Sequence, residues 1–193
     1  MVNKMFNYNP FRDRDKILTD LFIEYIEPKE EIIDIGPGNG AISRHVFNKK
    51  KVDVVLVDVV DKREEYAEGF KFLLYDGKKL PFSDESFDTS LLITVLHHTH
   101  NPEQVLREAI RVAKNKVIIV EDVYNNSIEK YQTFLADSLA NNEFFGHPHT
   151  NKSEGEWLEL FGKLNLKLLS KKENVMSYYF FHFKNMSFVL KKS

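Results

Sequence analysis

The sequence contains no cysteine, and this absence excludes disulfide bonds, a thiolate metal site and a cysteine nucleophile. It also lacks an excess of charge of either sign. The 27 lysine and arginine residues and the 29 aspartate and glutamate residues leave a formal net charge of -2, which gives no electrostatic reason to expect a nucleic-acid partner. No hydrophobic run approaches the length of a membrane span, and residues 1–10 lack the apolar segment of a signal peptide. We therefore expect a cytoplasmic protein without a membrane segment.

The chain does have the composition of an ordinary globular domain. Hydrophobic residues make up 42% of its 193 residues, and charged residues make up 29%. This length is sufficient for one domain with a full hydrophobic core. We expect a single domain over 1–193, with a helical segment at 1–28 and a lid-like insertion at 123–152. Nothing in the sequence indicates the oligomeric state.

The most informative segment is residues 32–40, which read IIDIGPGNG. An apolar run contains an acid, Asp34, and leads into glycines at the alternate positions 36, 38 and 40. This pattern predicts a buried strand that enters a tight turn, followed by a helix over 41–48. Because glycine has no Cβ atom, a ligand can lie directly on the backbone of such a turn. The free N–H groups at the start of the helix favour a polar or anionic group, so many nucleotide-like cofactors fit this pattern.

Two interpretations of this turn compete. As Gly36-x-Gly38-x-x-Ala41, with Asp58 about twenty residues later, it fits the dinucleotide-binding fingerprint. As Asp34-x-Gly36-x-Gly38-x-Gly40, it resembles the first motif of the class I S-adenosylmethionine-dependent methyltransferases. The acid two residues before the first glycine favours the second interpretation.

Three later segments strengthen this resemblance. Residues 52–58 (VDVVLVD) form a second apolar run that ends in an acid, and residues 72–88 (FLLYDGKKLPFSDESFD) contain an acid, then Leu-Pro-Phe, then Phe-Asp. Residues 94–98 (TVLHH) resemble the segment after the fourth strand in small methyltransferases related to the quinone-biosynthesis C-methyltransferases. These segments occur in the order that the family has. The resemblance is weaker but continues to Glu121 and again over 147–161.

Strand and helix patterns alternate along the chain. We expect a helix over 13–26 that Pro28 ends, strands at 31–35, 52–58, 70–74, 87–93 and 116–121, and helices at 41–48 and 102–113. Ser153 and Glu156 fit a capping box that opens a helix through Leu164. Strand patterns near 166–173 and 178–190 follow without a helix between them, so they can pair only as a hairpin. The expected fold is α/β: a Rossmann-like, doubly wound, mostly parallel seven-stranded sheet with a C-terminal antiparallel hairpin, which the resemblance gives the strand order 3-2-1-4-5-7-6.

The resemblance also implies the cofactor, S-adenosylmethionine, with S-adenosylhomocysteine as its product. Asp58 would hold the ribose hydroxyls, Asp76 would accept from the adenine amino group, and Asp34 would orient the turn and the ammonium group. The full set of implied cofactor residues is Asp34, Gly36, Gly38, Gly40, Asp58, Val59, Asp76, Gly77, Ile93 and Thr94. Structural roles compete with two of these assignments, since Asp34 could cap the following helix and Asp76 could be a turn aspartate before Gly77.

Methyl transfer needs alignment and exclusion of water, and a base helps when the acceptor is weakly acidic. The candidate bases are His149, His147 and His98. We expect the acceptor site near Glu121 and Asp122, the segment at His97 and His98, and the insertion around His147 and His149. No carboxylate or cysteine pattern accompanies the histidines, so we expect no metal.

The acceptor expected from the sequence is a small molecule, with a protein side chain as the second choice. The absence of cysteine excludes the thiolate mechanism of cytosine C5-methylation, and the Pro-Pro-aromatic signature of adenine N6-methylation is absent after the fourth strand. Two alternatives from other classes stay open. One is a catalytically silent cofactor-binding partner module. The other is an NAD-dependent oxidoreductase. The C-terminal hairpin pattern argues against this alternative.

Overall fold

The computed structural model describes residues 13–124, 129, 150–178 and 181–192. Most of the expected insertion at 123–152 and the first twelve residues therefore lie outside the described residues. Within the described ranges, no helix is both long enough and apolar enough to cross a bilayer.

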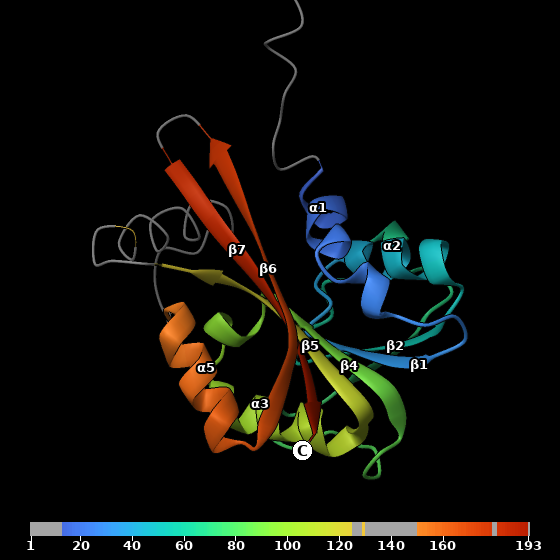
Figure 1. Ribbon diagram of the computed structural model, residues 1–193. Coiled ribbons are helices and arrows are strands. Elements are labelled where there is room, and N and C mark those ends of the chain that lie inside the picture. Colours follow the sequence, from blue (N-terminus) through green and yellow to red (C-terminus); the bar gives the residue numbers. More distant parts are fainter. Residues whose placement is uncertain (1–12, 125–128, 130–149, 179–180, 193) are drawn as a thin grey trace, which may run out of the picture.

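A single seven-stranded sheet forms the centre of the molecule, with the order β3-β2-β1-β4-β5-β7-β6 (Figure 1). The first five strands pair in parallel, and β7 is antiparallel to both β5 and β6. This confirms the predicted fold class and strand order. The strands are β1 (Glu31–Ile35), β2 (Asp53–Asp58), β3 (Lys71–Leu74), β4 (Phe87–Ile93), β5 (Ala113–Val123), β6 (Leu166–Tyr178) and β7 (Phe181–Lys192).

Helices cover both faces of the sheet (Figure 1). On one face, α3 and α5 pack over a core that includes Trp157 and Phe188. On the other, α1 and α2 pack over a second core that includes Phe22 and Val189. The α-helices are α1 (Arg14–Asp20), α2 (Ala41–Lys50), α3 (Pro102–Val112) and α5 (Glu154–Lys163), and the 3-10 helices are η1 (Ile23–Tyr25), η2 (Glu65–Ala67) and η3 (Leu96–His98).

Local sequence explains where the helices begin. The Asn101 side chain accepts from the Gln104 N–H at the start of α3, and proline occupies the first helical position. Ser153 and Glu156 form the predicted capping box of α5, each accepting from the backbone of the other. These contacts satisfy N–H groups that the first turn of a helix leaves without partners.

Several predicted boundaries were wrong, among them the end of the strand expected near 166–173, which runs to Tyr178, and two others have a clear local cause. The helix expected over 13–26 ends at Asp20, because the chain tightens there to bonds from Leu21 to Leu18 and from Phe22 to Thr19 and continues as η1. The strand expected over 116–121 runs from Ala113 to Val123, since Ala113 already pairs with Phe87 of β4. Sequence patterning missed this start because Ala-Lys-Asn has low β propensity.

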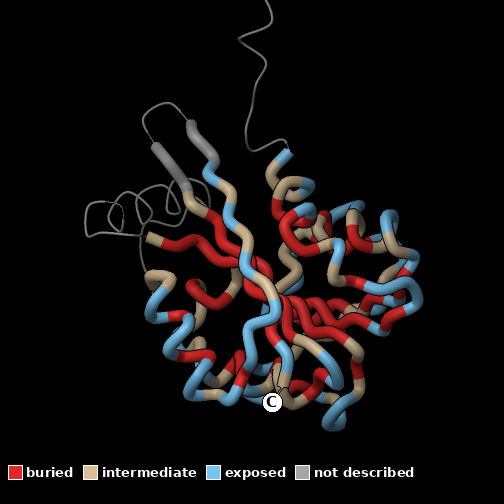
Figure 2. The backbone as a smooth tube through the Cα atoms, viewed as in Figure 1, coloured by how far each residue is buried: buried red, intermediate tan, exposed pale blue. Residues whose placement is uncertain are grey.

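Burial follows this layered arrangement. In Figure 2 the inner strands are buried along most of their length, and exposed residues lie on the outer sides of the helices. The strand order reverses between β1 and β4, which are neighbours in the sheet. In open α/β sheets, ligands bind beyond the carboxyl ends of the strands at such a reversal. The glycine turn follows β1 at that place.

Candidate functional site

The glycine turn combines two tightly packed positions with one open position. All three glycines have positive φ angles, 75° at Gly36, 56° at Gly38 and 88° at Gly40. A Cβ atom on Gly36 would lie 2.2 Å from Val95 Cγ2, and one on Gly40 would lie 2.7 Å from Ala67 Cβ. A Cβ atom on Gly38 would meet nothing within 4 Å. The turn is therefore packed against protein at both ends, and its middle faces open space where a ligand can approach the backbone.

Asp34 lies beneath this turn and contacts α2. It is only 2% exposed, and its Oδ2 atom accepts a hydrogen bond of 2.5 Å from the Ser43 hydroxyl. The Ala41 N–H donates instead to Asn39 Oδ1 at 3.0 Å, so Asp34 holds the helix through Ser43 and not by capping its first N–H. Burial raises the pKa of Asp34 to about 7; the bond from Ser43 opposes this shift and the nearby charge of Asp58 adds to it.

The raised pKa of Asp34 gives a prediction for stability against pH. Because the folded protein binds this proton up to about pH 7 and the unfolded chain releases it near pH 3.8, the contribution of Asp34 to stability falls as pH rises through that window. Relative to Asp34→Asn, the wild type should lose roughly 2 kcal/mol of unfolding free energy between pH 5 and pH 8. Urea unfolding of both proteins at the two pH values measures this. Equal pH dependence in the two proteins would show that Asp34 does not titrate in this range.

Asp58 is the last residue of β2, and Asp76 follows the adjacent strand β3. Asp58 Oδ1 accepts from the N–H groups of Val59 at 2.7 Å and Val60 at 3.4 Å. Partial burial raises the pKa of Asp58, and these backbone hydrogen bonds lower it by a smaller amount. Asp76 Oδ1 accepts from Lys78 and Lys79 at 2.9 and 3.2 Å, and these bonds lower its pKa. Asp76 therefore makes the contacts of a turn aspartate, and its Oδ2 atom is not used by either of these bonds.

An exposed apolar surface lies between these two carboxylates. Val59 is 54% exposed, and a Cβ atom on Gly77 would lie 3.2 Å from its Cγ1 atom, so the two residues are in close contact. Tyr75 is half-buried here, and burial, with the charges of Asp58 and Asp76, raises its pKa to about 12. Apolar surface beside carboxylate acceptors suits a heterocycle that carries hydroxyl and amino groups.

The segment after β4 packs directly against the glycine turn. Ile93 is buried at the end of β4, and Thr94, with φ 52°, donates its N–H to the Val120 carbonyl at 2.7 Å. The next residue, Val95, is the one that a side chain on Gly36 would strike. The loop after β4 and the turn after β1 therefore share one surface.

Glu121 on β5 anchors this loop from below. It is fully buried, and its Oε1 atom accepts from the N–H groups of Val95 at 3.1 Å and Leu96 at 2.7 Å. Its Oε2 atom lies 2.5 Å from His97 Nδ1, which donates to the carboxylate. These bonds commit both carboxylate oxygens to the protein, so the structure gives Glu121 a positioning role at the predicted acceptor site.

The candidate histidines differ in accessibility. His97 is buried against Glu121, whereas His98 is half-buried with its ring centroid 4.0 Å from that of His97. The other two candidates, His147 and His149, lie outside the described residues. The described chain resumes at Thr150, whose N–H donates to the His97 carbonyl at 3.1 Å and whose hydroxyl donates to the Leu96 carbonyl. Thr150 thus lies against the loop after β4, which contains His97 and His98 and was predicted to border the acceptor site.

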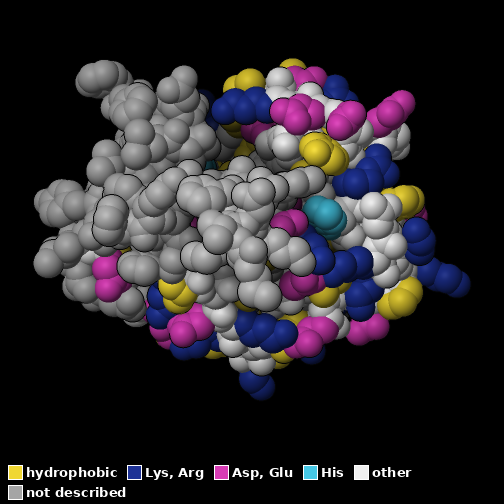
Figure 3. Space-filling view, turned by 90° about the horizontal axis from the view of Figure 1, so that it is seen from above, with side chains coloured by type: hydrophobic (Ala, Val, Ile, Leu, Met, Phe, Trp, Pro, Cys, Tyr) yellow, Lys and Arg dark blue, Asp and Glu magenta, His cyan; other side chains and the backbone are white. Residues whose placement is uncertain are grey.

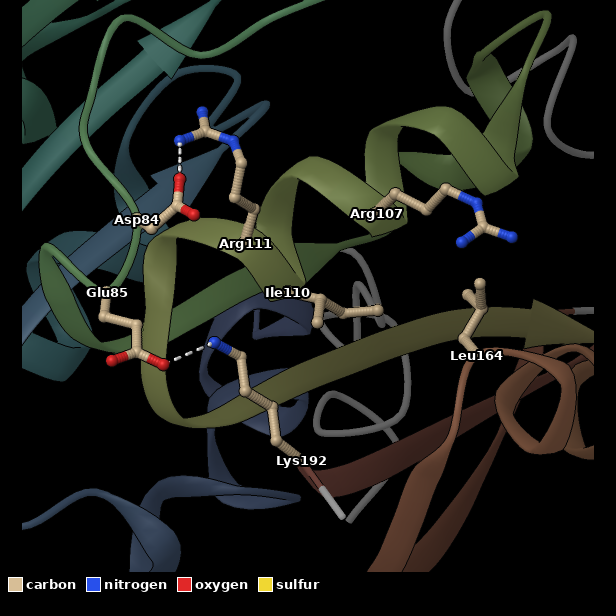
Figure 4. A pocket seen from close by; sticks show the side chains of 7 residues that line it. All are labelled: Asp84, Glu85, Arg107, Ile110, Arg111, Leu164 and Lys192. Atoms are coloured by element: carbon tan, nitrogen blue, oxygen red, sulfur yellow. Dashed lines mark hydrogen bonds and ion pairs between the residues drawn. The ribbon is translucent and has the colours of Figure 1, made fainter.

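Charged side chains of both signs surround this edge of the sheet. Figure 3 looks down on it, and in the described part acidic and basic side chains are intermixed. A separate hollow of about 270 Å³ lies at the opposite, amino edge (Figure 4). Arg111 there pairs with Asp84 at 2.9 Å and Lys192 pairs with Glu85 at 3.3 Å. Since these charges neutralise each other far from the glycine turn, the hollow is not part of the candidate site.

Comparisons with known proteins concern both the fold and the sequence of residues 33–120. A structure of an S-adenosylmethionine-dependent methyltransferase from Methanosarcina mazei superimposes with a TM-score of 0.70 at 19% identity, covering 88% of this chain and 95% of that one. Residues 33–120 match a family model described as a methyltransferase domain. This segment has the sequence of a methyltransferase domain, and the described chain has the fold of the class I methyltransferases. The matched segment spans the glycine turn, Asp58, Asp76 and the loop after β4, and it ends within β5.

Curated relatives of the methyltransferase domain match only part of their own length. An uncharacterized protein of Methanocaldococcus jannaschii is 34% identical over 119 residues, which cover 58% of this chain and 56% of that protein. A demethylmenaquinone methyltransferase of Thermotoga maritima is 27% identical over 128 residues, covering 63% of this chain and 55% of that enzyme. The chain thus spans about half the length of these curated relatives, and the solved structure, at its low identity, establishes the fold alone.

Proposed function

We propose that this protein is an S-adenosylmethionine-dependent methyltransferase that acts on a small molecule. The observation that carries the proposal is the open position at Gly38 after β1, together with Asp58 and Asp76 at the carboxyl ends of the next two strands, β2 and β3. The four sequence segments between residues 32 and 98 also occur in the order that methyltransferases have. They comprise the glycine turn, two strand ends and the loop after β4.

The residues present fit this cofactor. The methionine part of the cofactor would lie on the backbone at Gly38, bordered by Ile93 and Thr94. Asp34 would orient the glycine turn and the ammonium group of the cofactor. The ribose hydroxyls would donate to Asp58, and the adenine amino group to Asp76, with the ring over Val59 and Gly77. Each assignment pairs a donor of the cofactor with an acceptor of the protein, or apolar surface with a ring.

The cofactor supplies the electrophilic methyl group, and the protein supplies position. Its residues would hold the acceptor in line with the methyl group and exclude water, which needs no covalent enzyme intermediate. The loop of Val95 to His97 is fixed by Glu121 and provides a rigid wall for this purpose. His98, His147 and His149 are the candidate bases for an acceptor that must lose a proton.

A small-molecule acceptor agrees with two findings. The Thermotoga maritima relative is a demethylmenaquinone methyltransferase, which is named for a quinone and not for a protein or nucleic acid. The formal net charge of -2 provides no general attraction for nucleic acid. A protein acceptor, or a silent module that serves a partner subunit, would use the same cofactor contacts. An NAD-dependent oxidoreductase would need a different C-terminal topology from the β6–β7 hairpin.

Binding measurements test the cofactor assignment through Asp58. Asp58→Ala should bind S-adenosylhomocysteine roughly tenfold to a hundredfold more weakly than the wild type, because it loses a charge-assisted hydrogen bond to the ribose. Asp53→Ala, which removes an exposed acid at the other end of β2, is the matched control and should bind normally. Isothermal titration calorimetry with S-adenosylmethionine, S-adenosylhomocysteine and NAD separates the cofactors.

The result that would reject the assignment is affinity of Asp58→Ala within twofold of the wild type. Binding of NAD without binding of S-adenosylhomocysteine would instead support the oxidoreductase alternative. Cofactor binding with no methyl transfer to any acceptor in a small-molecule panel would favour the silent module.

A further inference from the structure

Three polar side chains form a row across β5, β7 and β6 near the carboxyl edge of the sheet. Asp122 pairs with Asn185 of β7, and Asn185 pairs with Asn174 of β6. We call Asp122, Asn185 and Asn174 the polar row. Cross-strand pairs point their side chains to the same face of a sheet, so these three side chains are neighbours.

The polar row lies on the face that α1 and α2 cover. Val120 of β5 and Val189 of β7 belong to the core on that face, and side chains alternate between faces along a strand. Asp122 is two residues beyond Val120, so it shares that face. Glu121 points to the opposite face, where it anchors the loop after β4. The two adjacent acids of β5 therefore serve different surfaces.

The row also lies just past the end of β4. The last residue of β4, Ile93, pairs with Val120, and β5 continues beyond that pair to Val123. Since neighbouring strands are about 4.8 Å apart, Asp122 stands one strand spacing to the side of the β4 end and two residues above it along β5. Ile93 and Thr94 at that end are the residues assigned to border the methionine part of the cofactor. The row therefore begins beside the place where the methyl group would be held.

The row keeps unused hydrogen-bonding capacity in a buried position. The Asn185 amide nitrogen donates to Asp122 Oδ1, and Asn185 is only 1% exposed. In the part of the chain that the structure describes, the Asn185 amide oxygen and the Asn174 amide nitrogen are buried and have no hydrogen-bond partner. A buried polar atom without a partner is costly, so such atoms commonly indicate a bound ligand or water.

We propose that the polar row is the wall of the acceptor site that receives the hydroxyl or amine group to be methylated. Such a group both donates and accepts hydrogen bonds. It can donate to the Asp122 carboxylate or to the Asn185 amide oxygen. A hydroxyl can in addition accept from the Asn174 amide nitrogen with one lone pair while the other attacks the methyl group, whereas an amine must keep its one lone pair for the attack. Acceptors without a hydroxyl or amine offer no such donor, so the row favours acceptors that present one of these groups at the methylation position. This inference rests on the proposed methyltransferase function.

Sinefungin provides a direct probe of this wall. In this analogue of S-adenosylmethionine, a carbon that bears an amine replaces the sulfonium and its methyl group, so the amine projects towards the acceptor. The quantity to measure by calorimetry is the ratio of the dissociation constants of S-adenosylhomocysteine and sinefungin. The row should favour sinefungin, and this preference should fall about tenfold in Asn185→Leu and in the isosteric Asp122→Asn.

The matched control is Ser187→Ala. Ser187 lies on the same face, two residues from Asn185 along β7, and its hydroxyl already donates to the Leu21 carbonyl at 3.3 Å. This variant should leave the ratio unchanged although it alters the same strand. Circular dichroism checks that each variant is folded, and Asp122→Asn decides the test if Asn185→Leu is not folded.

An unchanged ratio, within twofold, in the folded row variants would overturn the inference. The row would then be a strand-pairing ladder whose amides bond to each other after a small rotation. Failure of the wild type to bind either compound would reject the proposed function itself, and with it the inference. Weaker binding of both compounds by the same factor would also overturn the inference, because it would indicate general damage to the cofactor site.

Discussion

A Gly38→Val variant should lose at least about a hundredfold in affinity for S-adenosylhomocysteine and remain folded. The expected loss corresponds to about 2.7 kcal/mol of binding free energy. Its cause is steric, since a Cβ atom on Gly38 meets no protein atom within 4 Å and would occupy the space proposed for the cofactor. Calorimetry measures the affinity, and circular dichroism with thermal unfolding measures the fold.

Substitutions at two other glycines are controls that distinguish a loss of cofactor binding from an effect of backbone strain. Gly69 has a φ angle of 80° and equally open surroundings, but it lies before β3, at the amino edge of the sheet. Gly69→Val should therefore bear the same strain without loss of affinity. Gly36→Ala should lower the melting temperature, because its Cβ atom would lie 2.2 Å from Val95. Normal binding by folded Gly38→Val would show that the open side of the turn does not face the cofactor.

The glycine turn and the acid at the end of β2 were predictable from the sequence because their signals are local. The apolar run before Gly36, the alternate glycines and the acid that ends β2 are each fixed by a turn or a strand end. The hairpin at the C-terminus was also predictable, since two strand patterns without a helix between them leave one way to pair. The sheet order then followed from the family resemblance and is confirmed.

The contacts that hold the site together were not predictable, because they join residues distant in sequence. The Ser43 hydroxyl reaches Asp34 nine residues away, and Val95 packs where Gly36 lacks a side chain. No sequence pattern distinguishes Glu121 from Asp122. Because side chains alternate between the two faces of β5, Glu121 contacts the loop after β4 and Asp122 belongs to the polar row. The α1 boundary was missed for a related reason, since helical spacing of apolar residues continues into η1 although the helix does not.

The role of Glu121 leads to the largest expected effect on stability. Glu121→Ala removes the only carboxylate seen to accept from Val95, Leu96 and His97 in the described ranges, and it leaves one partly buried and two buried donors without these bonds. Breaking such a buried, charged network typically costs about 3–5 kcal/mol. For a chain of this size, the melting temperature should fall by roughly 6–20 °C.

Two variants sharpen this test. Glu121→Gln keeps an oxygen that can accept from the loop but replaces the acceptor of His97, so its melting temperature should lie between those of the wild type and Glu121→Ala. Glu159→Ala removes an exposed acid paired with Lys163 on α5 and should leave the melting temperature unchanged. Because Glu121 fixes the loop that packs against Gly36, Glu121→Ala should also weaken cofactor binding below its melting temperature. A melting temperature within 2 °C of the wild type, an order-of-magnitude limit below the expected shift, would mean that the loop after β4 is held by other contacts.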